Sequence, residues 1–241
     1  MKKIIFNYLC TLLIFTLLCT PFVYLSGKIK SPSNYRATAI TKDHIPTIII
    51  DAGHGGEDGG TVGVTGVLEK DINLKISFII RDMLLASGYD VVMTRSEDVL
   101  LYDRNTDYKG RKKALDLAAR VKIASAYENS IFVSIHMNSF PEKKYSGLQV
   151  YYSRNDPSSK EIADEIQSLV SRTLQVSNSR IPKLASSNIF VLDRITTPAV
   201  LVECGFLSNY EECLMLESDE YLKKLAFVIS QALQKYILST T

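Results

Sequence analysis

The sequence lacks the features that mark several large classes of protein. Its 241 residues contain 28 Lys and Arg against 26 Asp and Glu, so the net charge is only +2. No basic stripe is interleaved with aromatic residues, and nucleic acid is therefore not an expected partner. There is also no internal repeat and no low-complexity tract, which argues against a solenoid and against a disordered chain.

Cysteines are few and do not form a disulfide framework. Cys10 and Cys19 lie in an apolar N-terminal segment, which leaves Cys204 and Cys213 as the only pair in the globular part. We expect these two to be separate thiols. Cys204 follows Glu203 in an apolar run, and successive side chains of a strand point to opposite faces. Cys204 should therefore face away from any site that Glu203 faces.

Common nucleotide-binding and hydrolase signatures are missing. The run from Gly53 to Gly60 is rich in glycine, but the third position of a G-x-G-x-x-G motif falls on Asp58. No Gly-Lys-Ser or Gly-Lys-Thr is present for a P-loop, and no G-x-S-x-G nucleophile elbow occurs. A Cys-His nucleophile would need the Cys204 side chain that is expected to point away.

The N-terminal segment, residues 1–27, is long and apolar. Lys2 and Lys3 precede a nearly uninterrupted apolar stretch from Ile4 to Leu25, which is long enough to span a bilayer. Positive charge before it favours a cytoplasmic amino end, with the rest of the chain outside. We expect an uncleaved membrane anchor, and a cleaved signal peptide is the alternative, although no small-x-small cleavage site is evident.

Two further points concern this end of the chain. A lipoprotein signal ending at Cys19 is less consistent with the bulky Leu18 before it. Residues 28–45 are polar, contain Pro32 and show no periodicity, so they are expected to form a linker.

The globular part, residues 46–241, is expected to be one α/β domain. Strands are predicted at Thr47–Asp51, Tyr89–Met93, Ile131–His136, Leu148–Ser153, Asn188–Leu192 and Ala199–Glu203. Helices are predicted at Glu69–Ser87, Ala114–Tyr127, Pro157–Val176 and Asp219–Leu238. This alternation predicts a mainly parallel or mixed sheet of about six strands, flanked by helices.

Polar side chains recur where the predicted strands end. His54 follows the first strand, and His136 and Glu203 each end a strand of their own. In open α/β sheets, ligands bind at the carboxyl edge of the strands. Glu69 opens the helix after the first loop and lies at the same edge, where the helix dipole favours an anion. We therefore expect all four side chains to converge.

Two histidines and one glutamate resemble a catalytic zinc site that keeps one position open. His54, Glu69 and His136 would be the ligands of a single Zn²⁺. Such an ion lowers the pKa of its water and polarises a carbonyl oxygen. Glu203, outside the ligand set, could then take a proton from water and pass it to a leaving amine. This set predicts the cleavage of an amide bond.

Taken alone, each of these residues has a structural explanation. The two histidines could be a hydrogen-bonded turn residue and a strand cap, and Glu69 could be a helix-start charge. Glu203 could be half of a buried ion pair, with Arg194 or Arg120 as its partner. The joint placement favours the site. The third histidine, His44, lies in the linker and is expected to be solvated.

Two neighbouring residues are weaker candidates. Asp51 could orient His54 through its second ring nitrogen, as metal-bound histidines usually require, or it could cap the turn. Asn138 could bind substrate or shape the turn before Pro141.

The stretch from Pro46 to Leu238 resembles the zinc-dependent N-acetylmuramoyl-L-alanine amidases of the amidase 3 family. The resemblance rests on four motifs in order: IIIDAGHGGEDGG, GVLEKDINL, IFVSIHMNS and TTPAVLVECGFLSNYEE. It implies that His54, Glu69 and His136 bind zinc and that Glu203 is the catalytic carboxylate. The implied substrate is peptidoglycan, at the amide between N-acetylmuramic acid and L-alanine. Ala52, Met137 and Cys204 depart from the usual motifs, and none of these positions is an implied ligand.

Within that family the resemblance is strongest to sporulation enzymes. It implies removal of stem peptides from the spore cortex, so that muramic-δ-lactam can form, in the space between the two forespore membranes. Some relatives carry an inhibitory helix after the strand histidine, and residues 139–157 leave no room for one. We therefore expect an open groove and control by location, expression or an extracytoplasmic activating protein.

Two other functions remain open at this stage. On chemistry alone, a zinc endopeptidase that cuts within the stem peptide fits equally well. A membrane-tethered peptidoglycan-binding protein without activity is the second alternative, although its site would be free to lose Glu203 and the ligands.

Overall fold

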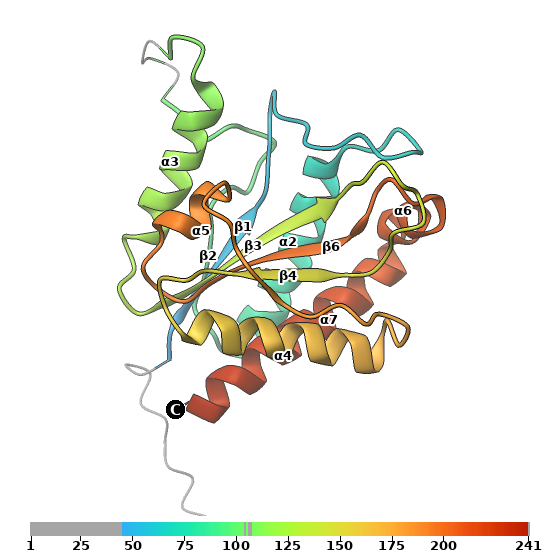
Figure 1. Cartoon of the computed structure of the whole chain (residues 1–241). Coiled ribbons are helices and arrows are strands. Elements are labelled where there is room, and N and C mark those ends of the chain that lie inside the picture. Colours follow the sequence, from blue (N-terminus) through green and yellow to red (C-terminus); the bar gives the residue numbers. More distant parts are fainter. Residues whose placement is uncertain (1–44, 104, 106–107, 241) are drawn as a thin grey trace, which may run out of the picture. The chain divides into compact units, whose positions relative to one another are not determined.

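The computed structural model describes residues 45–103, 105 and 108–240, which form an α/β fold (Figure 1). The strands are β1 (Thr47–Ala52), β2 (Val91–Met93), β3 (Ser130–Asn138), β4 (Gln149–Tyr152), β5 (Lys183–Leu184) and β6 (Ala199–Phe206). The helices are α2 (Glu69–Ala86), α3 (Lys112–Ala124), α4 (Ser158–Thr173), α5 (Phe190–Arg194), α6 (Tyr210–Glu217) and α7 (Asp219–Thr240).

The six strands form one mixed sheet in the order β2-β1-β3-β6-β4-β5. The pairs β2–β1, β1–β3, β3–β6 and β4–β5 are parallel, whereas β4 runs antiparallel to β6. The predicted mixed α/β sheet of six strands is confirmed. Because β4 runs against β6, its first residue lies at the edge where β1, β3 and β6 end.

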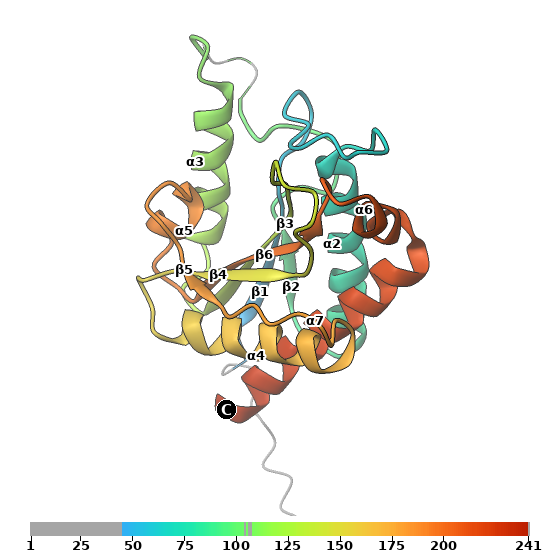
Figure 2. The same ribbon diagram turned by 45° about the vertical axis from the view of Figure 1, so that its right-hand side comes forward.

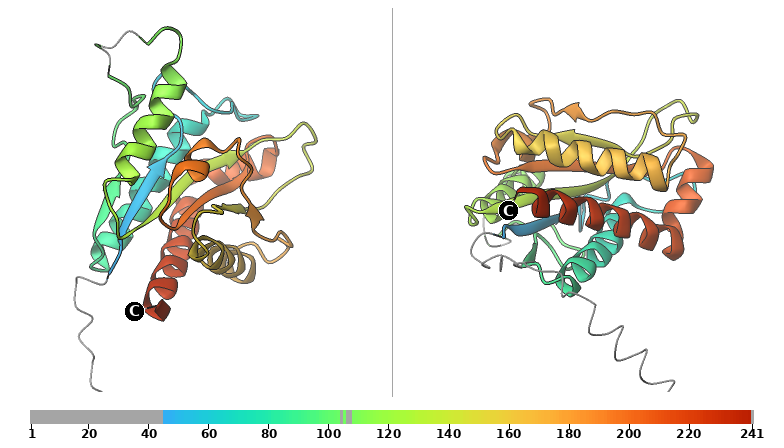
Figure 3. Two further views of the ribbon diagram at one scale, coloured as in Figure 1. Left: turned by 60° about the vertical axis from the view of Figure 1, so that its left-hand side comes forward. Right: turned by 90° about the horizontal axis from the view of Figure 1, so that it is seen from below.

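Helices cover both faces of the sheet (Figure 2). On one face, α2, α4 and α7 pack over a large core that contains Ile50, Val133 and Val202. On the other face, α3 and α5 pack over a smaller core around Phe132 and Leu201. Figure 3 shows α4 and α7 side by side on the face of the sheet that carries the larger core. The β-branched, fully buried strand residues are those expected of a sheet covered on both faces.

One predicted strand is wrong. Residues 188 and 189 form a turn and Phe190 begins helix α5, and Val191 and Leu192 are buried in the smaller core as part of that helix. A short apolar run fits a buried helical turn as well as a strand, so its periodicity could not separate the two. The two-residue strand β5 and the short helix α6 were not predicted.

Cys204 and Cys213 are free and buried, which confirms that they are separate thiols. Cys204 belongs to the larger core, on the face opposite to Glu203, as predicted. The expected anchor or signal segment (1–27) and linker (28–45) fall almost wholly outside the described residues. Within the described part of the chain, no helix combines the length and apolar character needed to cross a membrane.

Candidate metal centre and active site

The carboxyl ends of three strands place the predicted site residues together. His54 follows β1, His136 is near the end of β3, and Glu203 lies in β6 as the register partner of His136. The fourth residue, Glu69, is the first residue of α2 and is 3% exposed. The predicted convergence is confirmed for His54, Glu69 and His136, because one ligand atom from each lies within 4.8 Å of the others.

One carboxylate oxygen is the centre of this cluster. Glu69 Oε1 lies 3.2 Å from His54 Nε2 and 2.9 Å from His136 Nδ1. The two imidazole rings meet edge to face, with their centroids 4.9 Å apart. The backbone N–H of Met137 donates to the same oxygen at 3.1 Å, while that of Thr61 donates to Glu69 Oε2 at 2.8 Å. The carboxylate is thus fixed from both sides.

The donor set fits a zinc ion. Two imidazole nitrogens and one carboxylate oxygen are the ligands that catalytic zinc sites use. With zinc–ligand distances of about 2.0–2.1 Å and tetrahedral angles, neighbouring ligand atoms are separated by roughly 3.3 Å. The two distances from Glu69 Oε1, 3.2 and 2.9 Å, are close to that value.

The loop that carries His54 is held by two buried arginines. His54 has a φ of 62°, a conformation that is strained for a residue with a side chain. Arg120 Nη2, from α3, donates to the His54 backbone oxygen at 2.7 Å, and its Nη1 donates to the Ala52 oxygen at 2.8 Å. Arg95 Nη2 donates to the Gly53 oxygen at 3.0 Å. These contacts stabilise the strained turn.

Two glycines leave the space that the ligands occupy. A Cβ on Gly53 would lie 2.3 Å from Cε1 and Nε2 of the His136 ring. A Cβ on Gly60, whose φ is 66°, would lie 2.6 Å from Glu69 Oε2 and 2.8 Å from His54 Cδ2. The loop backbone therefore packs directly against all three side chains.

Asp51 does not orient His54, which was the first of the two roles considered for it. Its carboxylate is fully engaged in the sheet, where it accepts from Arg120, Thr94 and Ser134. The carboxylate beside His54 is instead that of Asp58, whose Oδ1 lies 3.0 Å from His54 Nδ1.

Asp58 lies four residues after His54 within the glycine-rich run, and only the fold of that loop brings them together. Asn138 shapes the turn: its Oδ1 accepts from the Ser139 N–H at 2.8 Å.

Glu203 does not form the ion pair considered as its alternative role. Arg120 pairs with Asp51 and Asp116, and Arg194 pairs with its neighbour Asp193. No described residue forms an ion pair with Glu203, and its Oε2 is buried without a hydrogen-bond partner among the described residues. A buried carboxylate oxygen left unpaired in this way calls for a functional explanation.

Residues 48–235 match the N-acetylmuramoyl-L-alanine amidase family. The chain belongs to this family.

Known relatives agree with that assignment. The chain is 36% identical over 189 residues to the germination-specific N-acetylmuramoyl-L-alanine amidase of Bacillus subtilis, covering 78% of each chain. Among solved structures it is similar to the CwlD amidase of Clostridioides difficile, in complex with the GerS lipoprotein: 39% identity, TM-score 0.77, 81% of this chain and 100% of that one. The amidase AmiC2 of Nostoc punctiforme gives 29% identity, TM-score 0.68, and 80% and 97% coverage.

The protein is therefore an amidase that acts on peptidoglycan. Because peptidoglycan lies outside the cytoplasmic membrane, its site of action is extracytoplasmic. The connection from β3 to β4, residues 139–148, contains no helix, as predicted.

The charge states of the amidase site follow from its contacts. Burial opposes ionisation of Glu69, but His136 and His54 outweigh it and lower the pKa of Glu69 far below its usual range. Burial lowers the pKa of His54, and the carboxylates of Glu69 and Asp58 reverse this and raise it. Burial raises the pKa of Glu203 to about 7, although the two histidines oppose the rise. Glu203 is thus suited to exchange a proton near neutral pH.

Proposed function

We propose that His54, Glu69 and His136 hold one Zn²⁺ and that Glu203 is the catalytic acid–base residue for hydrolysis of the amide between N-acetylmuramic acid and L-alanine. The observation that carries this proposal is the position of Glu69 Oε1, which lies 3.2 and 2.9 Å from two imidazole nitrogens. Glu203 supports it as the register partner of His136, with an unpaired oxygen.

The proposed chemistry divides the work among these groups. A bound Zn²⁺ would supply Lewis-acid activation of the attacking water and of the amide carbonyl. Glu203 takes the proton that the water loses on attack and delivers it to the alanine nitrogen as the C–N bond breaks. Asp58 Oδ1 lies 3.0 Å from His54 Nδ1 and would favour the orientation of the ring in which Nε2 faces Glu69.

Similarity supports a more specific biological role. The germination-specific amidase of B. subtilis and the CwlD amidase are both related to this chain along nearly its whole catalytic part. We therefore propose that the amidase strips stem peptides from spore cortex, so that muramic-δ-lactam can form, in the space between the two forespore membranes. The solved CwlD amidase is in complex with a lipoprotein, and we propose an extracytoplasmic activating protein for this chain as well.

The proposed domain organisation places the catalytic domain at residues 46–241. Residues 1–27 would be a membrane anchor or signal segment, and residues 28–45 a linker. In this arrangement the N-terminal segment directs the enzyme to the extracytoplasmic side, where its substrate lies.

The test is to incubate the full-length protein, purified in mild detergent and loaded with zinc, with peptidoglycan. We expect newly exposed alanine amino groups, measured by end-group labelling. New amino groups on other stem residues would instead identify an endopeptidase. No new amino groups from a folded protein that holds one zinc, with or without candidate partner proteins, would favour a binding-only role.

The role of Glu203 is tested by a Glu203→Gln variant. Removal of the acid–base group should lower kcat by about 10²- to 10⁴-fold, with zinc content and melting temperature retained. Glu142→Gln, an exposed change in the β3–β4 connection, is the matched control. If Glu203→Gln turned over as fast as this control, the assignment of Glu203 would be abandoned.

A further inference from the structure

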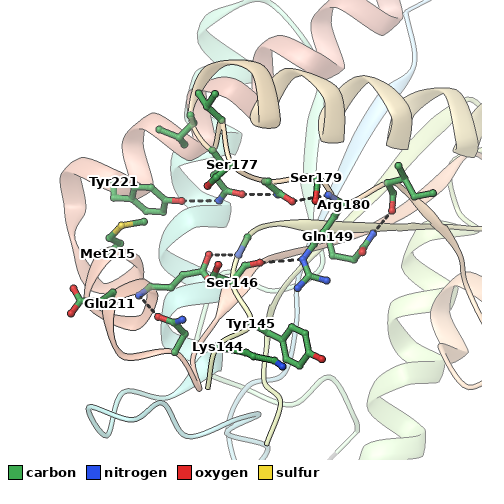
Figure 4. A pocket seen from close by; sticks show the side chains of 18 of the residues that line it. Lys144, Tyr145, Ser146, Gln149, Ser177, Ser179, Arg180, Glu211, Met215 and Tyr221 are labelled. Carbon is green, nitrogen blue, oxygen red and sulfur yellow. Dashed lines mark hydrogen bonds between the residues drawn. The ribbon is translucent and has the colours of Figure 1, made fainter. Parts of the chain in front are cut away.

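A cavity of about 1200 Å³ lies at the start of β4 (Figure 4). Its walls come from β4 and the turn before it, from the 174–181 connection between α4 and β5, from α6, and from the first turn of α7. The chemistry proposed above uses none of these residues. The cavity is nevertheless at the same edge of the sheet as the catalytic centre, because β4 begins where β6 ends.

A row of side chains joins the cavity to the metal centre. Gln149, which lines the cavity, is the register partner of Glu203 in β6, and Glu203 is the register partner of His136 in β3. Register partners project from the same face of a sheet, with Cβ atoms about 4.5–5.5 Å apart. The face that carries the proposed acid–base residue therefore continues directly into the cavity.

A bulge in β6 places an aromatic ring beside Arg180, which lines the cavity. His136 pairs with Glu203, but Asn138 pairs with Phe206, so β6 has one extra residue at this point. The extra residue turns the Phe206 side chain to the face of Glu203. The guanidinium carbon of Arg180 lies 4.8 Å from the Phe206 ring centroid and 6.0 Å from that of Tyr145.

Arg180 is held in place by its neighbours, but its guanidinium is not paired with a carboxylate among the described residues. Its Nε donates to the Ser146 oxygen at 3.1 Å, and the aromatic rings support the guanidinium plane. Figure 4 shows this guanidinium at the sheet end of the cavity. It forms no ion pair with any residue that the structure describes. A planar guanidinium fixed in this way is suited to bind a carboxylate.

Gln149 offers an unused acceptor at the same place. It is 1% exposed, and its Nε2 donates to the Ile181 oxygen at 2.7 Å and the Val150 oxygen at 3.1 Å. Both partners are carbonyl groups, which fixes the amide with its nitrogen toward them. Gln149 Oε1 is buried and has no partner among the described residues. A ligand N–H would satisfy it.

The charge of the cavity matches one part of the substrate. Three cationic residues line it: Lys144, Arg180 and Lys183. Two glutamates, Glu211 and Glu212, also line it, and the Glu212 carboxylate already accepts hydrogen bonds from the N–H groups of Gly147 and Phe206, at 2.8 and 2.7 Å. Peptidoglycan has an uncharged glycan and a peptide stem that carries carboxylates and peptide N–H groups. The stem begins at the nitrogen of the bond that is cut.

We propose that this cavity is the subsite for the peptide stem, in which Arg180 pairs with a stem carboxylate and Gln149 Oε1 accepts a hydrogen bond from a stem peptide N–H. The proposal rests on the proposed cleavage of the muramyl–alanine amide. It assigns the glycan to the other side of the metal centre, toward α3 and α5.

The test is a binding measurement that needs no turnover. The probe is the tripeptide L-alanyl-γ-D-glutamyl-L-lysine, titrated into the zinc-loaded full-length protein by calorimetry. Arg180→Gln should weaken binding by about 10- to 100-fold, as expected for a lost charged hydrogen bond. The same tripeptide with both carboxylates amidated should bind the wild type as weakly as the free tripeptide binds this variant.

Controls separate the subsite from general effects. Arg172→Gln, an exposed change whose Nε contacts only its own helix, should bind like the wild type. Gln149→Met, similar in volume, should lose about 2- to 10-fold in affinity. Because this change also removes the donor to the Ile181 and Val150 backbone oxygens, its folding is checked separately by its melting temperature. Equal affinities of the wild type, Arg180→Gln and Arg172→Gln would overturn the proposal.

The absence of tripeptide binding to the wild type would also overturn the proposal. In that case the exposed Val176 and Ile181 at the rim would indicate a protein-docking surface. Because the probe contains no muramyl amide, tripeptide binding without peptidoglycan cleavage would overturn the proposed function and leave the subsite standing.

Discussion

Arg120 Nη2 on helix α3 donates a hydrogen bond to the backbone oxygen of His54 at 2.7 Å. A buried cation far along the chain thus holds the backbone of a proposed zinc ligand in its left-handed conformation. The same guanidinium pairs with Asp51 and Asp116, both buried. The site and the stability of the domain therefore depend on one side chain.

Arg120→Met should destabilise the protein strongly, because it leaves two buried carboxylates without their partner. Breaking a buried pair of this kind costs about 3–5 kcal/mol in the free energy of unfolding, measured by urea denaturation. Arg194→Met removes an exposed pair with Asp193 and should cost less than about 0.5 kcal/mol. Similar losses for the two variants would contradict the role given to Arg120.

Gly53→Ala should impair the site more than the fold. The new methyl group would lie 2.3 Å from the His136 ring, so the ring must move, and a displacement of about 1 Å can cost on the order of 10²-fold in rate. Gly59→Ala, in the same loop, meets only Leu68 at 3.7 Å and should keep near-normal activity. Comparing kcat and zinc content of the two variants checks the prediction, which a fully active Gly53→Ala would refute.

Zinc should stabilise the protein as well as activate it. A ligand that binds only the folded state, at 100 times its Kd, raises the free energy of unfolding by about 2.7 kcal/mol. This corresponds to a rise in Tm of roughly 5–10 °C, which chelation should reverse together with activity. His136→Ala should lose the zinc-dependent rise and His44→Ala should keep it. An unchanged rise in His136→Ala would remove His136 from the ligand set.

Acid should weaken the fold through Asp51. Burial raises the pKa of Asp51, but Arg120, Ser134 and Thr94 outweigh it and lower that pKa below 3.8. A depressed carboxyl pKa contributes stability that is complete above the unfolded value, about 3.9, and is lost as pH falls through the folded value. The metal-free protein should therefore lose stability below about pH 4, and Asp51→Asn should reduce that dependence. The partly exposed control Asp193→Asn should behave like the wild type.

The two buried cysteines should not react with thiol reagents in the folded protein. Cys204 and Cys213 are both fully buried, and burial raises the pKa of the Cys204 thiol, which suppresses the reactive thiolate. Ellman's reagent should detect both only after unfolding. Rapid reaction of Cys204 in the native state would show that the strand face opposite Glu203 is open.

The sequence was sufficient for the elements with long, regular patterns. Helix α2 begins at Glu69 as predicted, because an apolar helical pattern starts there directly after a glycine-rich loop. Strands β1, β3 and β6 were found from β-branched runs that stay buried on both faces. Since those strands are parallel, the placement of His54, His136 and Glu203 at one edge followed from the order of the elements.

The supporting contacts of the site could not be predicted in the same way. Arg120 reaches His54 across 66 positions of sequence and Arg95 reaches Gly53 across 42, and neither belongs to a local pattern. The carboxylate beside His54 is that of Asp58 and not that of Asp51, because Asp51 already accepts hydrogen bonds from Arg120 and Ser134. The place of the cavity at this edge depends on the antiparallel pairing of β4 with β6, and the position of Arg180 depends on the ring that the β6 bulge places beside it. Both are set by tertiary packing.

The order of the strands has a consequence for biosynthesis. β6 is the last strand in sequence, yet it lies between β3 and β4 in the sheet. During synthesis, which proceeds from the amino end, His54, Glu69 and His136 leave the ribosome well before β6. The sheet cannot form completely until β6 is inserted between β3 and β4. Truncated copies that end before Ala199 lack both that strand and Glu203, so we expect them neither to complete the sheet nor to cleave peptidoglycan.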